Sequence, residues 1–263
     1  MSNSQGAFVW YELMTPDPAG ATAFYDAVIG WTIQAEGRAM SSGAEYREIL
    51  AQDGQHSGGV LTLSPEMQQE GARPAWIGYV AVDDVDTTLA RAVERGATTF
   101  IEPMDMEGIG RMAMLADPQG APFYILSGPA VGASRAWQMM SPGHVAWNEL
   151  NTSDPEAARS FYYGLFGWTD GEAMPMGEMG TYQMFDHAGQ TIGAMMQLIR
   201  QSAPVPLWLF YFAVEDIDEA HRAIPANGGQ VLQEPQEIPG GMFALSARDP
   251  QGAMFALVGP RKG

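Results

Sequence analysis

The sequence contains no cysteine among its 263 residues. This absence excludes a disulfide framework, a thiolate nucleophile and a thiolate metal site. Basic residues are scarce too, since 13 Lys and Arg stand against 31 Asp and Glu and give a net charge of −18. A surface this acidic repels nucleic-acid phosphates and anionic lipid headgroups, so neither nucleic acid nor a membrane is an expected partner.

Long hydrophobic runs are missing as well. No apolar stretch approaches the roughly 18 residues that a membrane-spanning helix needs. The amino-terminal segment MSNSQGAFVWYELMTPD has neither the basic residues nor the apolar region of a signal peptide. We therefore expect a cytoplasmic protein, and the chain is long enough for two domains of about 100 to 150 residues each.

The sequence is a tandem duplication. Residues 9–33, VWYELMTPDPAGATAFYDAVIGWTI, align without gaps on residues 146–170, AWNELNTSDPEAARSFYYGLFGWTD, with 12 of 25 positions identical. PAWIGYVAVDDVD matches PLWLFYFAVEDID further along, and DPQGAPFYIL matches DPQGAMFALV. Three collinear matches predict two homologous domains, 5–128 and 142–260, joined by a linker over residues 129–141.

Each copy alternates strand and helix signals. In the first copy Asp17 is a helix N-cap and Gly30 ends the helix; a later strand leads into a second N-cap, Asp84, and a helix that stops at Gly96. Short strand-like runs follow both helices. The pattern predicts an α+β fold in which each domain consists of two βαβββ modules that form a curved mixed sheet around a crevice.

These motifs resemble the vicinal oxygen chelate superfamily, which includes glyoxalase I, bleomycin and fosfomycin resistance proteins and extradiol dioxygenases. The resemblance covers nearly the whole chain, twice. The pattern W.EL.T.D…FY…GW, W..Y..V.D.D and DP.GA.F is similar to a two-domain glyoxalase-like subgroup, labelled hydroxylases, that contains a mycobacterial secreted antigen. Because a fold hosts many reactions, the resemblance implies the architecture and leaves open whether the chain is an enzyme of the lyase or dioxygenase kind.

The resemblance also implies a divalent cation held by His, Gln or Glu side chains. The six matching positions, taken in pairs from the two copies, hold Trp10 and Trp147, Ile77 and Leu209, and Tyr124 and Ala256. None of these is a conventional ligand, so we expect no metal and no other cofactor. Of the four histidines, strand alternation allows only the loop residues His56 and His187 to reach a crevice, whereas His144 falls on the wrong strand face and His221 on a helix.

Strand alternation places Glu12 on the same face as Trp10, and Glu149 on the same face as Trp147. A carboxylate beside an indole in an apolar pocket has a raised pKa and suits general acid–base catalysis, which makes Glu12 and Glu149 candidate catalytic residues. The alternative is that both carboxylates only hold the strand end through hydrogen bonds. Candidate ligand-binding residues are Trp10, Trp147, Tyr79, Tyr211, Tyr124 and Arg111. The change from Tyr124 to Ala256 predicts pockets of different size.

Three functions fit these residues. The first is a protein that binds a small organic molecule in the crevice, with any chemistry on Glu12 or Glu149. The second is a metal-dependent lyase or dioxygenase with atypical ligands drawn from Glu12, Glu149, His56 and His187. The third is a non-catalytic sequestering protein of the drug-resistance kind. A monomer and a homodimer are both compatible with a tandem chain.

Overall fold

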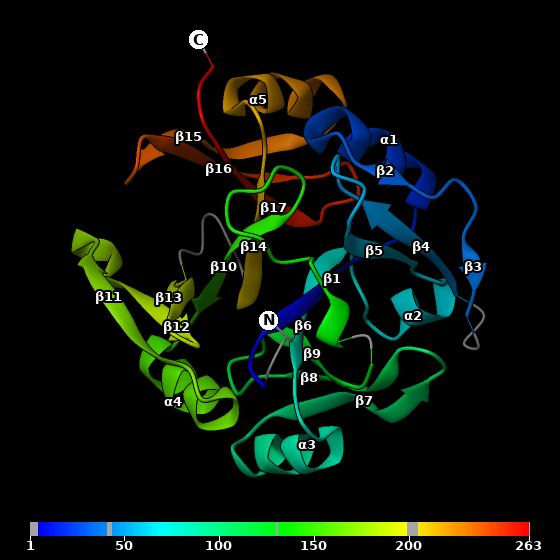
Figure 1. Ribbon diagram of the computed structural model, residues 1–263, viewed down its shortest axis with the longest axis vertical. Coiled ribbons are helices and arrows are strands. Elements are labelled where there is room, and N and C mark those ends of the chain that lie inside the picture. Colours follow the sequence, from blue (N-terminus) through cyan, green and yellow to red (C-terminus); the bar gives the residue numbers. More distant parts are fainter. Residues whose placement is uncertain (1–4, 41–43, 130, 199–204, 263) are drawn as a thin grey trace. The chain divides into compact units, whose positions relative to one another are not determined.

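The computed structural model describes residues 5–40, 44–129, 131–198 and 205–262 (Figure 1). Residue 130 of the predicted linker lies outside these ranges. No helix within them is long and apolar enough to cross a membrane.

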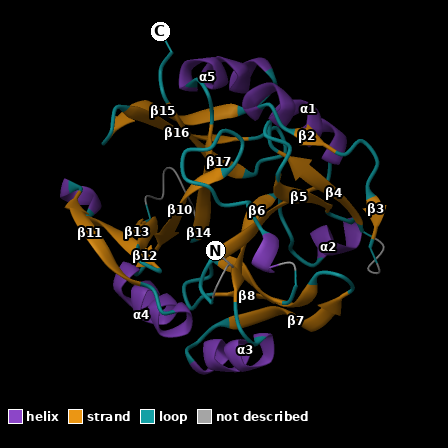
Figure 2. Cartoon of the chain, in the orientation of Figure 1, coloured by secondary structure: helices purple, strands orange, loops and turns teal. Residues whose placement is uncertain are grey.

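Strands outnumber helices throughout the described residues (Figure 2). The elements of the first copy are β1 (Phe8–Thr15), α1 (Pro18–Ile29), β2 (Thr32–Ile33), β3 (Arg38–Ala39), β4 (Glu45–Leu50), β5 (His56–Thr62), α2 (Pro65–Gln69), β6 (Ala75–Ala81), α3 (Val85–Glu94), β7 (Thr98–Met106), β8 (Gly110–Ala116) and β9 (Pro122–Ser127). Those of the second copy are β10 (Val145–Thr152), α4 (Pro155–Phe166), β11 (Thr169–Pro175), β12 (Thr181–His187), β13 (Gln190–Gln197), β14 (Leu207–Ala213), α5 (Ile217–Ala226), β15 (Gln230–Ile238), β16 (Met242–Arg248) and β17 (Met254–Gly259).

Each copy contributes one mixed sheet. Within the described ranges the first copy forms nine strands in the order β2-β4-β5-β1-β6-β9-β8-β7, with β3 paired to β4. The second copy forms eight strands in the equivalent order β11-β12-β13-β10-β14-β17-β16-β15. Pairs such as β1 with β5 and β6 with β9 are parallel, and the hairpins are antiparallel. The predicted α+β fold with duplicated mixed sheets is confirmed.

The compact units of the chain cut across the sequence repeat. Unit 1 comprises Met1–Val9, Gly78–Ser134 and Trp147–Leu209, and unit 2 comprises Trp10–Ile77, Arg135–Ala146 and Phe210–Gly263. Each unit therefore joins the first module of one copy to the second module of the other copy. In unit 2, helix α1 of the first copy packs beside helix α5 of the second (Figure 1).

The helices begin and end where capping chemistry predicts. The Asp17 carboxylate accepts a hydrogen bond from the Gly20 N–H at 2.9 Å, and Gly30 ends α1 in the left-handed conformation with φ of 81°. Asp154 and Gly167 repeat this arrangement around α4. Both helices bury a Phe-Tyr pair, which is Phe24 and Tyr25 in α1. The pair is thus directed into the core by helical spacing.

A buried tyrosine links the two copies within unit 2. The Tyr25 hydroxyl donates to Asp249 Oδ2 at 3.1 Å and accepts from Trp76 Nε1 at 2.9 Å. Asp249 Oδ1 accepts three backbone N–H groups of its own hairpin, those of Gln251, Gly252 and Ala253. Burial raises the pKa of Tyr25 well above its ordinary value, so the hydroxyl stays protonated and remains a donor.

Unit 1 contains the reciprocal arrangement. The Tyr162 hydroxyl donates to Asp117 Oδ2 at 3.1 Å and accepts from Trp208 Nε1 at 3.0 Å. Trp168 stacks on Tyr162 with ring centroids 5.7 Å apart. Each unit is therefore closed by a helix tyrosine of one copy that is bonded to a hairpin aspartate of the other.

We predict that Tyr25→Phe lowers the free energy of unfolding by about 2 to 4 kcal/mol, because it removes a donor to the buried Asp249 and an acceptor for Trp76. Urea unfolding followed by circular dichroism measures the change. Tyr163→Phe is the matched control, since its hydroxyl bonds to Asp170 at an exposed position, and we expect it to cost less than about 1 kcal/mol. Equal effects of the two substitutions would contradict the structural role of Tyr25.

A second prediction concerns pH. Burial raises the pKa of Asp117 and of Asp249 above the ordinary 3.8, although backbone donors and the tyrosine partly oppose this. The folded state then binds each proton more tightly than the unfolded chain does. The stabilising contribution is therefore complete below pH 3.8 and is lost as the pH rises through the raised folded pKa.

Relative to Asp249→Asn, the wild-type chain should lose stability as the pH rises above 3.8, by up to about 1.4 kcal/mol per pH unit, until the folded pKa is passed. Urea unfolding of both proteins between acidic and neutral pH measures this difference. Asp117→Asn should behave in the same way. A difference that does not change with pH would show that burial does not perturb these carboxyls.

Candidate functional site

A chain of hydrogen bonds surrounds Glu149 on one face of the second-copy sheet, in the part that belongs to unit 1. Trp147 Nε1 donates to the Tyr182 hydroxyl at 2.7 Å, and that hydroxyl donates to Glu149 Oε2 at 2.9 Å. Asn151 Nδ2 donates to Glu149 Oε1 at 2.9 Å. Glu149 and Asn151 are buried, whereas Trp147 and Tyr182 are partly exposed. The cluster, called the Glu149 cluster below, therefore presents an indole and a phenol to solvent above a fixed carboxylate.

Apolar side chains lie beside the Glu149 cluster on the neighbouring strands. In the strand register Glu149 lies beside Ala194, Asn151 beside Met196, and Tyr182 beside Met174. Met184 lies on the same face because it pairs with Ala194. Methionine is flexible and polarisable, so this lining can adapt to the shape of a ligand.

The first copy carries a related group in unit 2, the Glu12 cluster, made of Trp10, Glu12 and Tyr46. Trp10 Nε1 donates to the Tyr46 hydroxyl at 2.6 Å, and Glu12 is buried. Burial, and next the charge of Glu12, raise the pKa of Tyr46 well above its ordinary value, so its hydroxyl stays protonated beside the carboxylate. Gly59, the register partner of Glu12, leaves room for the Tyr46 hydroxyl, which a Cβ at this position would overlap.

The surroundings of the two clusters differ in polarity. Met14 stands where the second copy has Asn151, and Glu48, the other register partner of Gly59, stands where it has Met184. Glu48 also lies 3.7 Å from the exposed His56, whose ring is 6.2 Å from that of Trp10. The first-copy face thus carries the additional carboxylate of Glu48, where the second copy has the apolar Met184.

The remaining predicted ligand-binding residues lie elsewhere in the two units. Tyr79 and Tyr124 are register partners in unit 1 and stack with ring centroids 4.1 Å apart. Tyr211 and Ala256 are register partners in unit 2. Arg111 forms a two-pronged ion pair with Asp86 and a further bond to Asp105. The guanidinium of Arg111 is thus bonded to two carboxylates of the chain itself, and we assign it no ligand.

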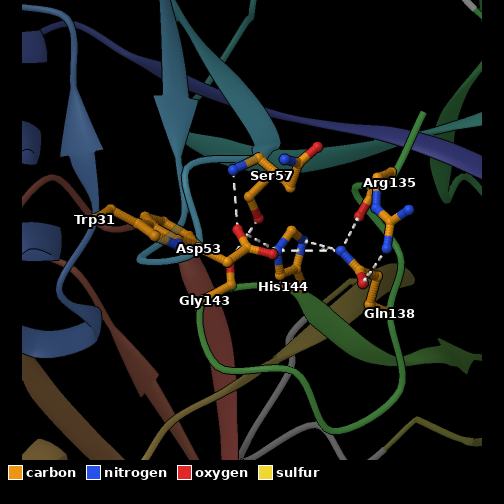
Figure 3. Close-up of polar contacts among 8 residues, drawn as sticks. Trp31, Asp53, Ser57, Arg135, Gln138, Gly143 and His144 are labelled. Carbon is orange, nitrogen blue, oxygen red and sulfur yellow. Dashed lines mark hydrogen bonds and ion pairs between the residues drawn. The ribbon is translucent and has the colours of Figure 1, made fainter. Parts of the chain in front are cut away.

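The four histidines are dispersed. His144 is buried, with its ring nitrogens 3.2 to 3.3 Å from Gln138 Nε2 and with Nε2 3.3 Å from Asp53 Oδ1 (Figure 3). The neighbouring Gly143 carbonyl accepts from Ser57 and Trp31 in the same close-up. The other three contact different partners: Glu48 for His56, the Gln5 carbonyl for His187 and Glu234 for His221.

The residues present do not fit a divalent cation at the positions that the sequence resemblance implies. Ile77, Leu209 and Ala256 carry no donor atom. Trp10 and Trp147 use their indole N–H groups on tyrosine hydroxyls. Across the described ranges, no three His, Asp or Glu side chains gather closely enough to hold a metal ion. No step of a reaction is therefore assigned to a metal.

Sequence reasoning missed the two tyrosines and the asparagine that complete these clusters. Tyr46 and Tyr182 lie at equivalent positions of the repeat, EYR and TYQ, which is the signal that could have indicated them. Asn151 follows Glu149 by two residues and therefore shares its strand face. The tyrosines lie on β4 and β12, which are two strands away from the glutamates on β1 and β10. Local sequence patterns do not show which strands become neighbours in a sheet, so the tyrosines could not be assigned to the glutamates.

Comparisons with known proteins agree with this architecture. The family model described as the Glyoxalase/Bleomycin resistance protein/Dioxygenase superfamily matches residues 141–257, and that described as a Glyoxalase-like domain matches residues 10–126. CFP32 of Mycobacterium tuberculosis, a protein named as a glyoxylase, is 32% identical over 263 residues, which cover 97% of this chain and 95% of CFP32. The anthracycline biosynthesis protein DnrV of Streptomyces peucetius is 32% identical over 269 residues, which cover 98% of this chain and 94% of DnrV.

Solved structures share the fold at low sequence identity. The Mn(II)-bound glyoxalase from Novosphingobium aromaticivorans has a TM-score of 0.63 at 16% identity, with 98% of this chain and 83% of that chain covered. Homoprotocatechuate 2,3-dioxygenase from Brevibacterium fuscum has a TM-score of 0.63 at 16% identity, with 98% of this chain and 81% of the dioxygenase chain covered.

We predict that Gly59→Ala displaces Tyr46 and breaks its bond to Trp10, at a cost of about 1 to 3 kcal/mol in the free energy of unfolding. The matched control is Ala194→Gly, the reverse change at the equivalent position, which should cost about 0.5 to 1 kcal/mol. Urea unfolding measures both. If Gly59→Ala were as stable as the wild type, Tyr46 would not need the space above residue 59.

Proposed function

Because this chain belongs to the Glyoxalase/Bleomycin resistance protein/Dioxygenase superfamily, we propose that it binds a small, flat, hydroxylated organic molecule at the Glu149 cluster. The observation that carries this proposal is the buried Glu149 carboxylate, which Tyr182 and Asn151 hold and which has methionines nearby on the neighbouring strands. A carboxylate accepts charge-assisted hydrogen bonds, which are stronger than hydrogen bonds between neutral groups.

The chemical class of the ligand follows from the lining. Trp147 and Tyr182 offer aromatic surface and Met174, Met184 and Met196 offer adaptable apolar contact, which together favour an aromatic ligand. Glu149 favours a ligand hydroxyl that donates a hydrogen bond. The net charge of −18 disfavours anionic ligands. The similarity to an anthracycline biosynthesis protein supports a polycyclic ligand of this kind.

We assign Glu149 the additional role of the group that exchanges a proton with the bound molecule, with Glu12 as its counterpart in the first copy. The hydrogen bonds from Tyr182 and Asn151 hold the carboxylate in one orientation, as a general base requires. Neither role needs a metal. A sequestering protein would use the same contacts without proton transfer. Analysis of the ligand after incubation with the protein separates these alternatives, because only proton transfer yields an altered molecule.

The test uses 1,4-dihydroxyanthraquinone as the probe, because it is flat, neutral and coloured and carries two phenolic hydroxyls. Fluorescence titration in buffer containing a chelator measures its affinity for the full chain. We expect Glu149→Gln to weaken binding roughly 10- to 100-fold, the worth of a hydrogen bond to a charged acceptor. Glu156→Gln, an exposed position on α4, is the matched control and should change the affinity less than about threefold.

Three results would overturn the proposal. The wild-type chain does not bind the probe, or Glu149→Gln binds it as well as the wild type does, or binding appears only after Mn(II) or Fe(II) is added. A loss confined to Glu12→Gln would place the ligand at the Glu12 cluster instead.

A further inference from the structure

A cavity of about 380 Å³ opens in unit 2, where β14 and β17 end and β16 begins. The segment before β10 completes its wall. All of the lining residues belong to unit 2, and none of them is part of the Glu12 cluster of that unit. A cavity of this volume accommodates a small organic molecule. It is called the Glu215 cavity below, after the carboxylate in its lining.

Most of the lining of the Glu215 cavity is apolar. Met242 packs against a group of buried core residues, and Val214 is itself buried. Met140, by contrast, is 40% exposed. Methionine side chains are flexible and polarisable, so this part of the wall adapts to the shape of a bound molecule. The apolar lining residues are Met140, Pro142, Val214, Met242 and Pro260.

The other two lining residues form an ion pair. Lys262 Nζ donates to Glu215 Oε2 at 2.7 Å, and both side chains are more than half exposed. The hydrogen bond to Glu215, followed by the charges of Glu215, Asp216 and Glu219, raises the pKa of Lys262, although desolvation opposes this. The ammonium therefore lies among more negative charges than it can neutralise.

The neighbouring cation does not change this balance. Arg261 is bonded to Asp218, with its Nε 2.9 Å from Oδ2, and its guanidinium lies over the Phe243 ring. Residues 215–219 carry four carboxylates, whereas residues 261 and 262 carry two cations. The charge at the edge of the Glu215 cavity thus favours a positively charged ligand.

We propose that the Glu215 cavity binds an apolar organic molecule that carries one ammonium group. The apolar body of the ligand lies on the methionine and proline side chains, and its ammonium replaces that of Lys262 on the Glu215 carboxylate. An exposed ion pair contributes little to stability, so its displacement costs little. The site is separate from the proposed function, because it uses neither Glu149 nor a ligand hydroxyl.

The experiment titrates dansylcadaverine, a fluorescent naphthalene derivative with a primary ammonium, into the full chain and records fluorescence anisotropy. Glu215→Gln should weaken binding about 3- to 10-fold, because the ligand loses its charged acceptor. Lys262→Ala removes the competing ammonium and should strengthen binding about 2- to 5-fold. Met140→Ser should weaken binding about 3- to 10-fold through lost apolar contact. Glu219→Gln, which removes the same charge beside the cavity, is the matched control and should change the affinity less than about twofold.

The N-acetylated form of the probe keeps the fluorophore and loses the charge, and we expect it to bind at least about 3-fold more weakly. Equal binding of the two probes, no binding of dansylcadaverine to the wild-type chain, or weaker binding to Lys262→Ala would overturn the inference. An equal loss in Glu219→Gln and Glu215→Gln would show only a diffuse attraction to the acidic surface and would overturn it as well.

A further variant separates this inference from the proposed function. Glu149→Gln should bind dansylcadaverine as the wild-type chain does. If Glu149→Gln lost the probe and Glu215→Gln kept it, the ammonium ligand would belong to the Glu149 cluster, and the Glu215 cavity would have no assigned ligand. Circular dichroism of every variant shows whether a loss reflects unfolding. If Glu215→Gln is unfolded, Lys262→Ala and the acetylated probe decide the question.

Discussion

The structure depends on a buried hydrogen bond between a helix tyrosine of one copy and a hairpin aspartate of the other. Tyr25 reaches Asp249 across 224 residues of sequence, and Tyr162 reaches Asp117 across 45. Backbone N–H groups fix each aspartate within its hairpin, so the bond sets the helix against the strands of the opposite copy. Each compact unit contains one such bond, and in neither copy does the buried tyrosine bond to the hairpin aspartate of its own copy.

A scaffold closed in this way tolerates divergence on its sheet faces, because the closing bonds lie elsewhere. Both copies have the Trp, Glu and Tyr of their clusters, but the neighbouring residues differ. The second copy has Asn151 bonded to Glu149 and methionines on the neighbouring strands. The first copy adds Glu48 and His56 near Glu12 and covers Tyr79 with Tyr124. Equivalent positions thus have unlike chemistry, and the surroundings of the Glu149 cluster suit an aromatic ligand with hydroxyl groups.

Much of this could be predicted from the sequence, because the decisive signals are local or repeated. Capping residues such as Asp17 and Gly30 located the helices, the duplication predicted the two sheets, and strand alternation grouped Trp147 with Glu149. The cluster tyrosines were missed because they depend on which strands are neighbours, which local periodicity does not specify. Arg111 could not be placed either, since its partner Asp86 lies on a helix 25 residues earlier. The interleaving of the units depends on the long-range tyrosine–aspartate bonds, which leave no mark in either copy alone.

We propose that the Glu149 carboxylate binds a hydroxyl of a flat aromatic ligand. The most direct measurement is a crystal structure of the full chain with 1,4-dihydroxyanthraquinone. We expect electron density for the probe with a hydroxyl about 2.6 to 3.2 Å from a Glu149 oxygen, a normal hydrogen-bond distance. Density only at the Glu12 cluster, or only at a surface site remote from Glu149, would contradict it.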